Sequence, residues 1–405
     1  MSFLWGLFGI FTVLGIGFLF STDRKRINWR TVLGGLAFQL AFAFIVLKWS
    51  FGQRMMLKLT EIVNAITGYA NDGINFLFGG LYTEQSGITS VFALNVLPMV
   101  IFFSALISVL YYLNIMQFFI KIIGGFLSSL LGTRKAESMS AAANIFVGQT
   151  EAPLVVRPYI QKMTESELFA VMTGGLASVS GSVLIGYSLL GVPLEYLLAA
   201  SFMAAPAGLV MAKLFVPETS DVPEPKEFKM ESDEDAVNVI DAAAKGASVG
   251  LQLALNIGAM LLAFIAIIAL LNGLLGWVGS WFGLNGLSLE MILGYFFAPI
   301  AFAIGVPWHE AVTAGSFIGQ KLVLNEFVAY SSFGPQIDSL TPKTVAIISF
   351  ALCGFANISS MAILIGGLGN LAPSRRADIA RLGLKAVIAG ALASLLSAAI
   401  AGMLL

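Results

Sequence analysis

Long apolar segments are the feature that most constrains how this chain folds. A helix needs about 20 mostly apolar residues to cross the hydrocarbon core of a bilayer, and eight segments meet or nearly meet this requirement: residues 3–20, 31–49, 91–113, 168–190, 194–216, 248–272, 344–369 and 380–404. Only 11% of the 405 residues are charged, whereas a soluble domain has about 25%. We therefore predict an all-α polytopic membrane protein with about eight transmembrane helices, whose main surroundings are the lipid bilayer.

Charge and cysteine content exclude several classes of partner. The net charge of −1 leaves no excess of basic residues to neutralise a nucleic-acid backbone. A single cysteine, Cys353, excludes an internal disulfide framework and a cluster of cysteine metal ligands. The apolar run 3–20 has no basic region before it and no small-residue cleavage site after it, so we interpret it as the first membrane helix and not as a signal peptide.

Other apolar stretches are interrupted too early to cross a membrane. Residues 138–160 and 305–333 are broken by glycine, proline or polar residues, which predicts two re-entrant helical hairpins. Residues 54–80 and 115–131 mix apolar and polar side chains, which is typical of helices that lie at the membrane interface or pack on the bundle.

The basic residues of the short loops predict the orientation. Loop 21–30 carries four of them, which favours a cytoplasmic location. Counting spans from this loop predicts that residues 134–135, loop 217–245 and residues 375–381 are also cytoplasmic, and that both termini are extracytoplasmic in a cell inner membrane. Loop 217–245 contains Pro223, Pro225 and the acidic run 231–235, and it divides the chain into two halves.

Each half repeats the same order of features. In the first half a broken segment carries Glu151 within Gly148–Pro153, and a polar break at residues 178–182 follows in the next span. In the second half a broken segment carries Glu326, and a polar break at residues 357–360 follows. With the predicted orientation, the two hairpins enter from opposite sides of the membrane. This is an inverted repeat, in which substrate sites lie where the broken helices meet near the bilayer midplane.

The two carboxylates require compensation, because an ionised carboxylate in the bilayer costs at least ~2.5 kcal/mol. Our interpretation is that Glu151 and Glu326 face an aqueous cavity and bind substrate hydroxyls, water or cations. The alternative is a structural ion pair, for instance between Glu151 and Arg157.

The polar groups near the breaks are neutral. Ser178, Ser180, Ser182, Asn357, Ser359 and Ser360 either line the cavity or hold helices together. The spans contain no paired arginines or lysines that could bind a phosphate or a carboxylate. A nucleoside or a sugar therefore fits better than a nucleotide, and the ring of Phe355 beside Asn357 could stack on a planar base.

Two other classes of function are disfavoured. His309-Glu310 begins like a zinc-protease helix, but the residue four positions after His309 is Thr313 and not histidine. An intramembrane hydrolase would need a nucleophile or metal set that the sequence lacks, so we predict that the protein is not an enzyme. An ion channel would need a continuous polar pore, which inverted broken hairpins do not favour.

These motifs resemble those of a known family. Residues 148–153 with Arg157-Pro158, and residues 319–330, look like the two signature hairpins of the concentrative nucleoside transporters. Residues 354–360 resemble the discontinuous seventh span of that family, and the similar layout extends over essentially the whole chain. The resemblance implies a homotrimer, in which a scaffold domain holds the trimer together and a transport domain moves like an elevator.

The resemblance also implies a domain layout. Residues 1–113 would be mainly scaffold and trimerisation helices, and residues 114–216 the first transport repeat with hairpin 138–160. After the cytoplasmic loop 217–245, residues 246–304 would form a scaffold helix and a connection. Residues 305–405 would be the second transport repeat with hairpin 305–333.

Site residues are implied in the same way. The nucleobase would contact Gln149, Thr150, Glu151 and Val183. The ribose would contact Glu326, Asn357 and Ser360, and Phe355 would border the site. A sodium ion would be held by the Asn144 side chain, the carbonyls of Val147 and Val179, and the carbonyl and hydroxyl of Ser178. Ligands that are all oxygen suit a hard cation.

The sequence of the first hairpin bears on the coupling ion. Some bacterial members of the family use protons, and they differ around the first hairpin. The intact Gln149-Thr150-Glu151 of this chain resembles the sodium-type members. We therefore predict a sodium symporter for nucleosides such as uridine, with a proton-coupled nucleoside symporter as the alternative.

Overall fold

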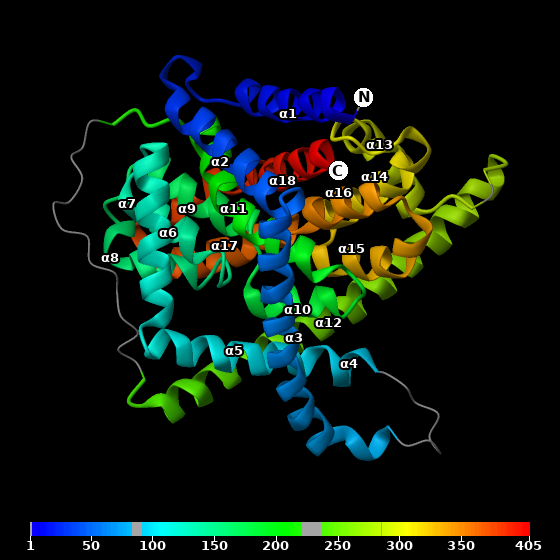
Figure 1. Cartoon of the computed structure of the whole chain (residues 1–405). Helices are drawn as coiled ribbons and strands as arrows, with labels where there is room; N and C mark the ends of the chain where they lie inside the picture. The colour runs from blue at the N-terminus through cyan, green and yellow to red at the C-terminus, as the bar shows by residue number, and fades with distance from the viewer. Residues whose placement is uncertain (1, 83–90, 221–235, 285) are drawn as a thin grey trace.

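The computed structural model describes residues 2–82, 91–220, 236–284 and 286–405, and the regular structure in these ranges is entirely helical (Figure 1). This confirms the predicted all-α class. The α-helices are α1 (Ser2–Leu19), α2 (Trp29–Leu47), α3 (Ser50–Phe78), α4 (Phe92–Asn95), α5 (Leu97–Tyr112), α6 (Ile115–Leu131), α7 (Lys135–Ala143), α8 (Arg157–Ile160), α9 (Glu165–Ala177), α10 (Gly181–Ser188), α11 (Leu194–Phe215), α12 (Val239–Trp281), α13 (Leu289–Ala303), α14 (Trp308–Val323), α15 (Glu326–Phe333), α16 (Pro342–Leu352), α17 (Ile358–Leu371) and α18 (Arg376–Leu404).

Six of the eight predicted spans are long and apolar enough to cross a membrane in the described part of the chain. They are Trp29–Leu47, Phe92–Tyr112, Glu165–Ser188, Leu194–Phe215, Val239–Trp281 and Pro373–Leu404. The other two predicted spans are helical but consist of shorter pieces. The first is α1, and the second, 344–369, is divided between α16 and α17.

Two boundaries differ from the sequence prediction. The loop predicted at 217–245 ends earlier, because α12 begins at Val239, where the Asn238 side chain accepts a hydrogen bond from the Asp241 N–H at 2.9 Å. Its middle part, 221–235, with the prolines at 223 and 225 and the acidic run, lies outside the described residues. Helix α13 falls within the stretch predicted as a connection, where its 15 residues with an internal Pro299 are too short to indicate a span.

The two halves repeat one order of elements. In the first half, α6 is followed by the hairpin of α7, η3 (Ala152–Val156) and α8, then by the broken pair α9 and α10, then by α11. In the second half, α13 is followed by the hairpin α14 and α15, the broken pair α16 and α17, and α18. The returning arm of the first hairpin is short and partly 3₁₀, because Pro153 and Pro158 interrupt it.

The centre of the bundle combines both halves. Helices α9, α10, α11 and α18 are almost entirely buried, whereas most of α12 is exposed.

Helix α12 packs closely on α5 through two glycines: a Cβ atom on Gly246 would lie 2.6 Å from the Cβ of Ser108, and one on Gly250 would lie 2.7 Å from the Cα of Ile101. The remaining apolar surface of α12 needs lipid or another chain to cover it.

Helix α1 packs along α18, so the first and last described helices are neighbours (Figure 1). A Cβ atom on Gly6 would lie 2.2 Å from the Cβ of Met403, and one on Gly9 would lie 2.6 Å from the carbonyl oxygen of Ala303. The indole N–H of Trp5 donates to the carbonyl oxygen of Phe302 at 2.7 Å. Only glycines permit this close approach of α1 to its neighbours.

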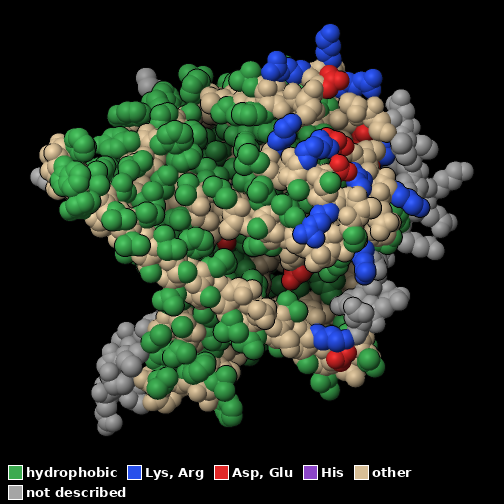
Figure 2. Space-filling view, turned by 180° about the vertical axis from the view of Figure 1, so that it is seen from behind, with side chains coloured by type: hydrophobic (Ala, Val, Ile, Leu, Met, Phe, Trp, Pro, Cys, Tyr) green, Lys and Arg blue, Asp and Glu red, His purple; other side chains and the backbone are tan. Residues whose placement is uncertain are grey.

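The basic loops meet on one face, where lysine and arginine side chains gather (Figure 2). Hydrogen bonds connect residues 24–30 and 134–135 to residues 217–220, and they connect residues 375–381 to residues 163–165. They join Arg26 to the Thr219 carbonyl, Arg134 to Glu167 and to the Ser220 carbonyl, Arg375 to the Met163 carbonyl, and Arg381 to Glu165. The three basic segments and the start of loop 217–245, which the sequence assigned to one side of the membrane, thus lie at the same end of the bundle.

A buried ion pair lies beneath this face. The Nζ of Lys213, in the last turn of α11, lies 2.5 Å from a carboxylate oxygen of Glu137 on α7. It also donates to the Ser166 hydroxyl on α9 at 2.9 Å, and this hydroxyl donates to the Val216 carbonyl oxygen at 2.6 Å. Both charged side chains are buried. The pair ties the first arm of the first hairpin to α9 and α11.

Candidate functional site

Glu326 lies at the break of the second hairpin, as the first residue of α15. The side chain of Asn325 caps this helix by accepting a hydrogen bond from the Val328 N–H at 2.8 Å, which fixes the direction in which α15 leaves the break. The Glu326 carboxylate is 6% exposed and accepts two hydrogen bonds, from the Tyr187 hydroxyl at 3.1 Å and from the Asn357 amide at 3.0 Å.

Asn357 connects this carboxylate to the start of α17. Its side-chain oxygen accepts from the Ser360 N–H at 2.8 Å and from the Ser359 hydroxyl at 2.7 Å. Its amide nitrogen donates to Glu326. The side chain therefore has one end on a helix N-terminus and the other on a carboxylate, which orients both groups relative to each other.

The tip of the first hairpin packs against the breaks of both spans. The Gly148 N–H donates to a carboxylate oxygen of Glu151 at 3.1 Å, which closes the turn. A Cβ atom on Gly175 would lie 2.9 Å from the Cβ of Gln149, and one on Gly367 would lie 3.0 Å from a methyl of Thr150. Gln149 therefore packs against α9, and Thr150 packs against α17.

The two broken spans touch each other at their breaks. The Phe355 N–H donates to the Ser178 carbonyl oxygen at 3.0 Å. A Cβ atom on Gly354 would lie 2.9 Å from the Ala177 carbonyl oxygen and 2.6 Å from the Ser394 hydroxyl. One on Gly148 would lie 3.9 Å from the Phe355 ring. The breaks of both halves and the tip of the first hairpin thus converge near Phe355.

We expect Gly354→Ala to disrupt this contact, because the added methyl cannot fit beside a backbone carbonyl. Overpacking of this kind costs about 1–3 kcal/mol, so the detergent-solubilised variant should melt at a lower temperature and transport more slowly. Gly366→Ala is the matched control, since a Cβ atom there meets nothing within 4 Å. Equal melting temperatures for the two variants would contradict the close approach.

Oxygen atoms gather where the first hairpin meets the break after α9. Asn144 is 1% exposed, and its amide nitrogen donates to the Ser140 carbonyl oxygen at 3.0 Å, while its side-chain oxygen has no hydrogen-bond partner. The Asn144 side chain lies against Gly174, whose carbonyl oxygen accepts from the Ser178 hydroxyl at 3.0 Å. A buried acceptor without a donor is costly, and a cation would satisfy it. In the described residues no group of three or more His, Cys, Asp or Glu side chains could hold a metal ion.

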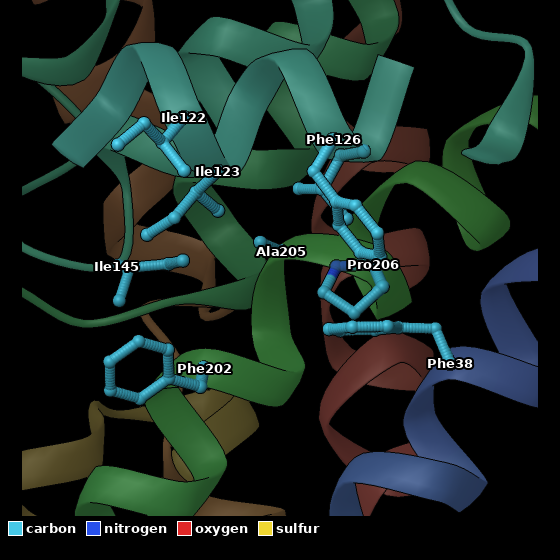
Figure 3. A pocket seen from close by; sticks show the side chains of 9 residues that line it. Phe38, Ile122, Ile123, Phe126, Ile145, Phe202, Ala205 and Pro206 are labelled. Carbon is cyan, nitrogen blue, oxygen red and sulfur yellow. The ribbon is translucent and has the colours of Figure 1, made fainter. Parts of the chain in front are cut away.

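A separate pocket of about 180 Å³ is apolar. It lies between α2, α6 and α11, and Phe38, Phe126, Phe202 and Pro206 are among its walls (Figure 3). None of its lining residues belongs to the polar groups above. It offers no hydrogen-bond partner for a polyhydroxylated solute and is not the candidate site.

Comparisons with known proteins match the whole chain. Residues 8–81 and 196–402 match the N-terminal and C-terminal models of the Na+ dependent nucleoside transporters, and residues 93–193 match a model described as nucleoside recognition. The chain is 48% identical over 411 residues to the nucleoside permease NupC of Helicobacter pylori, with 99% of this chain and 98% of the relative covered. The chain belongs to the concentrative nucleoside transporter family.

Other members of this family extend the comparison. An uncharacterised transporter of Bacillus subtilis, YutK, is 63% identical over the full length of both chains. The solved structure of the transporter CNTnw in an inward-facing substrate-bound state has 57% identity and a TM-score of 0.94, with 100% of this chain and 98% of that chain covered. A variant of CNTnw in an outward-facing state has 57% identity and a TM-score of 0.96, with the same coverage. The protein is thus a nucleoside transporter and not an enzyme.

The fold of this concentrative nucleoside transporter brings most of the predicted site residues together. Hydrogen bonds connect Glu326, Asn357 and Ser360. Gln149, Thr150 and Glu151 form the tip of the first hairpin. Val183 is buried in the first turn of α10, and Asn144, Val147, Ser178 and Val179 are all buried around the break after α9.

Sequence reasoning assigned no role to three residues near the second hairpin. Tyr187 donates to Glu326 and lies one turn after Val183 on α10, so helical spacing from a predicted site residue could have indicated it. Lys321 and Tyr330 lie within the signature motif and donate to carbonyls of α16. Nothing in their spacing indicated those partners, which come from the folding of the second hairpin onto α16.

Proposed function

We propose that this transporter imports nucleosides such as uridine by symport with sodium. The observation that carries the proposal is the Glu326 carboxylate, held between the Tyr187 hydroxyl and the Asn357 amide at a junction of broken helices. A buried carboxylate that already orients two neutral donors is suited to accept hydrogen bonds from ribose hydroxyls. Glu326, Asn357 and Ser360 would bind the ribose in this arrangement.

The base would lie toward the first hairpin. Gln149, Thr150, Glu151 and Val183 would contact it, and the Phe355 ring would border it. A ring between the two breaks offers a flat apolar surface for a planar base. This assignment predicts that the second repeat recognises the sugar, and that the polar contacts to the base come from the first repeat.

Sodium would occupy the oxygen-rich region beside the first hairpin. The unpartnered side-chain oxygen of Asn144 supports this ion site most directly. The carbonyls of Val147 and Val179 and both oxygens of Ser178 would complete it. An ion there would order the first hairpin and raise nucleoside affinity, and by reciprocity the nucleoside would raise sodium affinity by the same factor.

Alternating access would follow an elevator mechanism. A close relative has been solved in inward-facing and outward-facing states, which supports a large movement. Residues 114–216 and 305–405 would form the moving transport domain, and residues 1–113 with 246–304 the scaffold. The exposed apolar surface of α12 supports a homotrimer built on the scaffold.

The topology would follow the basic face. Positively charged loops remain in the cytoplasm, and the three basic segments lie at one end of the bundle, where lysine and arginine side chains gather (Figure 2). This end would face the cytoplasm in a cell inner membrane, with both termini on the opposite side.

Uridine uptake into proteoliposomes tests the function. With an inward sodium gradient, we expect accumulation of radiolabelled uridine above its equilibrium level, and no accumulation when choline replaces sodium. Equal uptake in choline under a proton gradient would support the proton-coupled alternative. No uptake of any nucleoside under either gradient would overturn the proposal.

Asn144→Ala tests the ion site. We expect it to remove the sodium dependence of uridine binding while the protein still folds, because it deletes the unpartnered oxygen. Isothermal titration of uridine with and without sodium measures this. Asn256→Ala, on the exposed face of α12, is the control. A sodium effect of wild-type size in Asn144→Ala would refute this ligand assignment.

A further inference from the structure

Lys321 is a lysine buried within the second hairpin. It lies in the last turn of α14, the first arm of the second hairpin, and is 2% exposed. Its Nζ donates to the Ala351 carbonyl oxygen at 2.9 Å. Removing an ammonium group from water is costly, so its position requires an environment that favours positive charge.

The end of α16 provides that environment. Helix α16 ends at Leu352, so Ala351 has one of the last four carbonyls that lack a partner within the helix. The C-terminal end of a helix carries partial negative charge and favours cations. The Tyr330 hydroxyl, also from the second hairpin, donates to the Ser349 carbonyl oxygen at 2.8 Å. The second hairpin thus supplies both a cation and a hydroxyl to this helix end.

The first repeat has a different arrangement at the corresponding place. Helix α9 also ends at a break, and its end faces the first hairpin. There the hairpin presents Asn144, whose free oxygen is an acceptor beside other carbonyls. In the first repeat, oxygen acceptors of the hairpin face oxygen acceptors at the end of α9, so a cation from solution is needed between them. In the second repeat, the Lys321 ammonium of the hairpin is that cation.

We propose that Lys321 is a covalently attached counterpart of the coupling ion, which rests on the sodium coupling proposed above. Its ammonium occupies the carbonyl end of α16 permanently, whereas sodium would occupy the carbonyl end of α9 only when it is bound. Lys321 precedes Glu326 by five residues on the same hairpin, so its bond to the end of α16 fixes the hairpin next to the ribose-binding carboxylate.

Lys321→Met and Lys321→Arg separate the charge from the packing. Methionine keeps most of the side-chain volume without the charge, and arginine keeps the charge. A charge at a helix end is worth up to ~2 kcal/mol, so we expect uridine affinity to fall roughly 10- to 30-fold in Lys321→Met. Lys321→Arg should retain more of it. Lys343→Met, at the half-exposed start of the same span, is the control and should bind as the wild type.

Two measurements make the test decisive. Uridine titration of purified protein gives the affinities, and melting temperatures show whether each variant folds. Wild-type affinity in Lys321→Met, or equal losses in the methionine and arginine variants, would overturn the role of the charge. If Lys321→Arg folds and Lys321→Met does not, the charge is required at this helix end, as proposed. If neither variant folds, the shape of the lysine and not its charge is required, which would overturn the proposal.

Failure of the proposed function is distinguishable from failure of this inference. Sodium-independent uridine binding by the wild type would refute the coupling and leave Lys321 to be judged by the affinity of Lys321→Met. Sodium-dependent uridine binding by the wild type, together with wild-type affinity in Lys321→Met, would support the coupling and refute the role of Lys321.

Discussion

Glu326→Gln is expected to abolish measurable uridine uptake while the protein folds and assembles normally. Glu326 accepts hydrogen bonds from Tyr187 and Asn357. A glutamine of the same shape would turn an amide N–H₂ toward at least one of these donors or toward a ribose hydroxyl. Truncating one partner of a buried, hydrogen-bonded charged group costs about 2–5 kcal/mol, which corresponds to a loss of roughly 30-fold or more.

Glu290→Gln provides the comparison for this prediction. The Glu290 carboxylate also accepts from an asparagine amide, that of Asn272, at 2.9 and 3.2 Å, but it lies at the start of α13 and away from the two breaks. Uptake by Glu290→Gln should stay near the wild-type rate. Normal uptake by Glu326→Gln would show that Glu326 does not bind the ribose. We also expect Asn357→Ala to be inactive, and normal uptake by that variant would exclude Asn357 from ribose binding in the same way.

Lys213→Met is expected to cause the largest loss of stability. The substitution leaves the buried Glu137 carboxylate without its ammonium partner at 2.5 Å. Breaking a buried pair from one side costs about 3–5 kcal/mol. The melting temperature of the detergent-solubilised protein should fall sharply, and the fall should be much larger than for Lys245→Met, whose exposed pair with Asp241 is screened by solvent and contributes little to stability.

The double variant Lys213→Met/Glu137→Gln tests the physical cause. Neutral replacement of both partners of a buried pair is often nearly neutral, so most of the lost stability should return. The glutamine oxygen can still accept from the Arg134 N–H, as Glu137 does at 2.8 Å. Additive losses in the double variant would mean that packing, and not an uncompensated charge, stabilises this junction.

The positions of the helix breaks could be predicted from the sequence, because the residues there are unfavourable in a continuous membrane helix. Polar residues such as Ser178 and Asn357 within apolar runs conflict with an unbroken membrane helix, and the structure has its breaks at Ser178–Ser180 and Cys353–Asn357. The carboxylates Glu151 and Glu326 were identifiable for the same reason. The six longest spans followed from hydropathy alone.

Partners that are distant in sequence could not be predicted in this way. Lys213 and Glu137 sit on α11 and α7, and their pairing depends on how three helices pack. The same holds for Lys321, whose acceptor belongs to α16. Helix α13 was missed because a short apolar segment with an internal proline has no distinctive signal by itself.

The packing of α1 on α18 has a consequence for biogenesis. Helix α1 leaves the ribosome before the other described helices, and α18 leaves after them. The surface of α1 around Gly6 and Gly9 therefore stays without its contacts to α18 for most of this time. At about 5–20 residues per second, this interval is roughly 20 to 70 s. Until α18 inserts, that face of α1 lies against lipid or an insertion chaperone, and α1 reaches its final packing only after α18 has been synthesised.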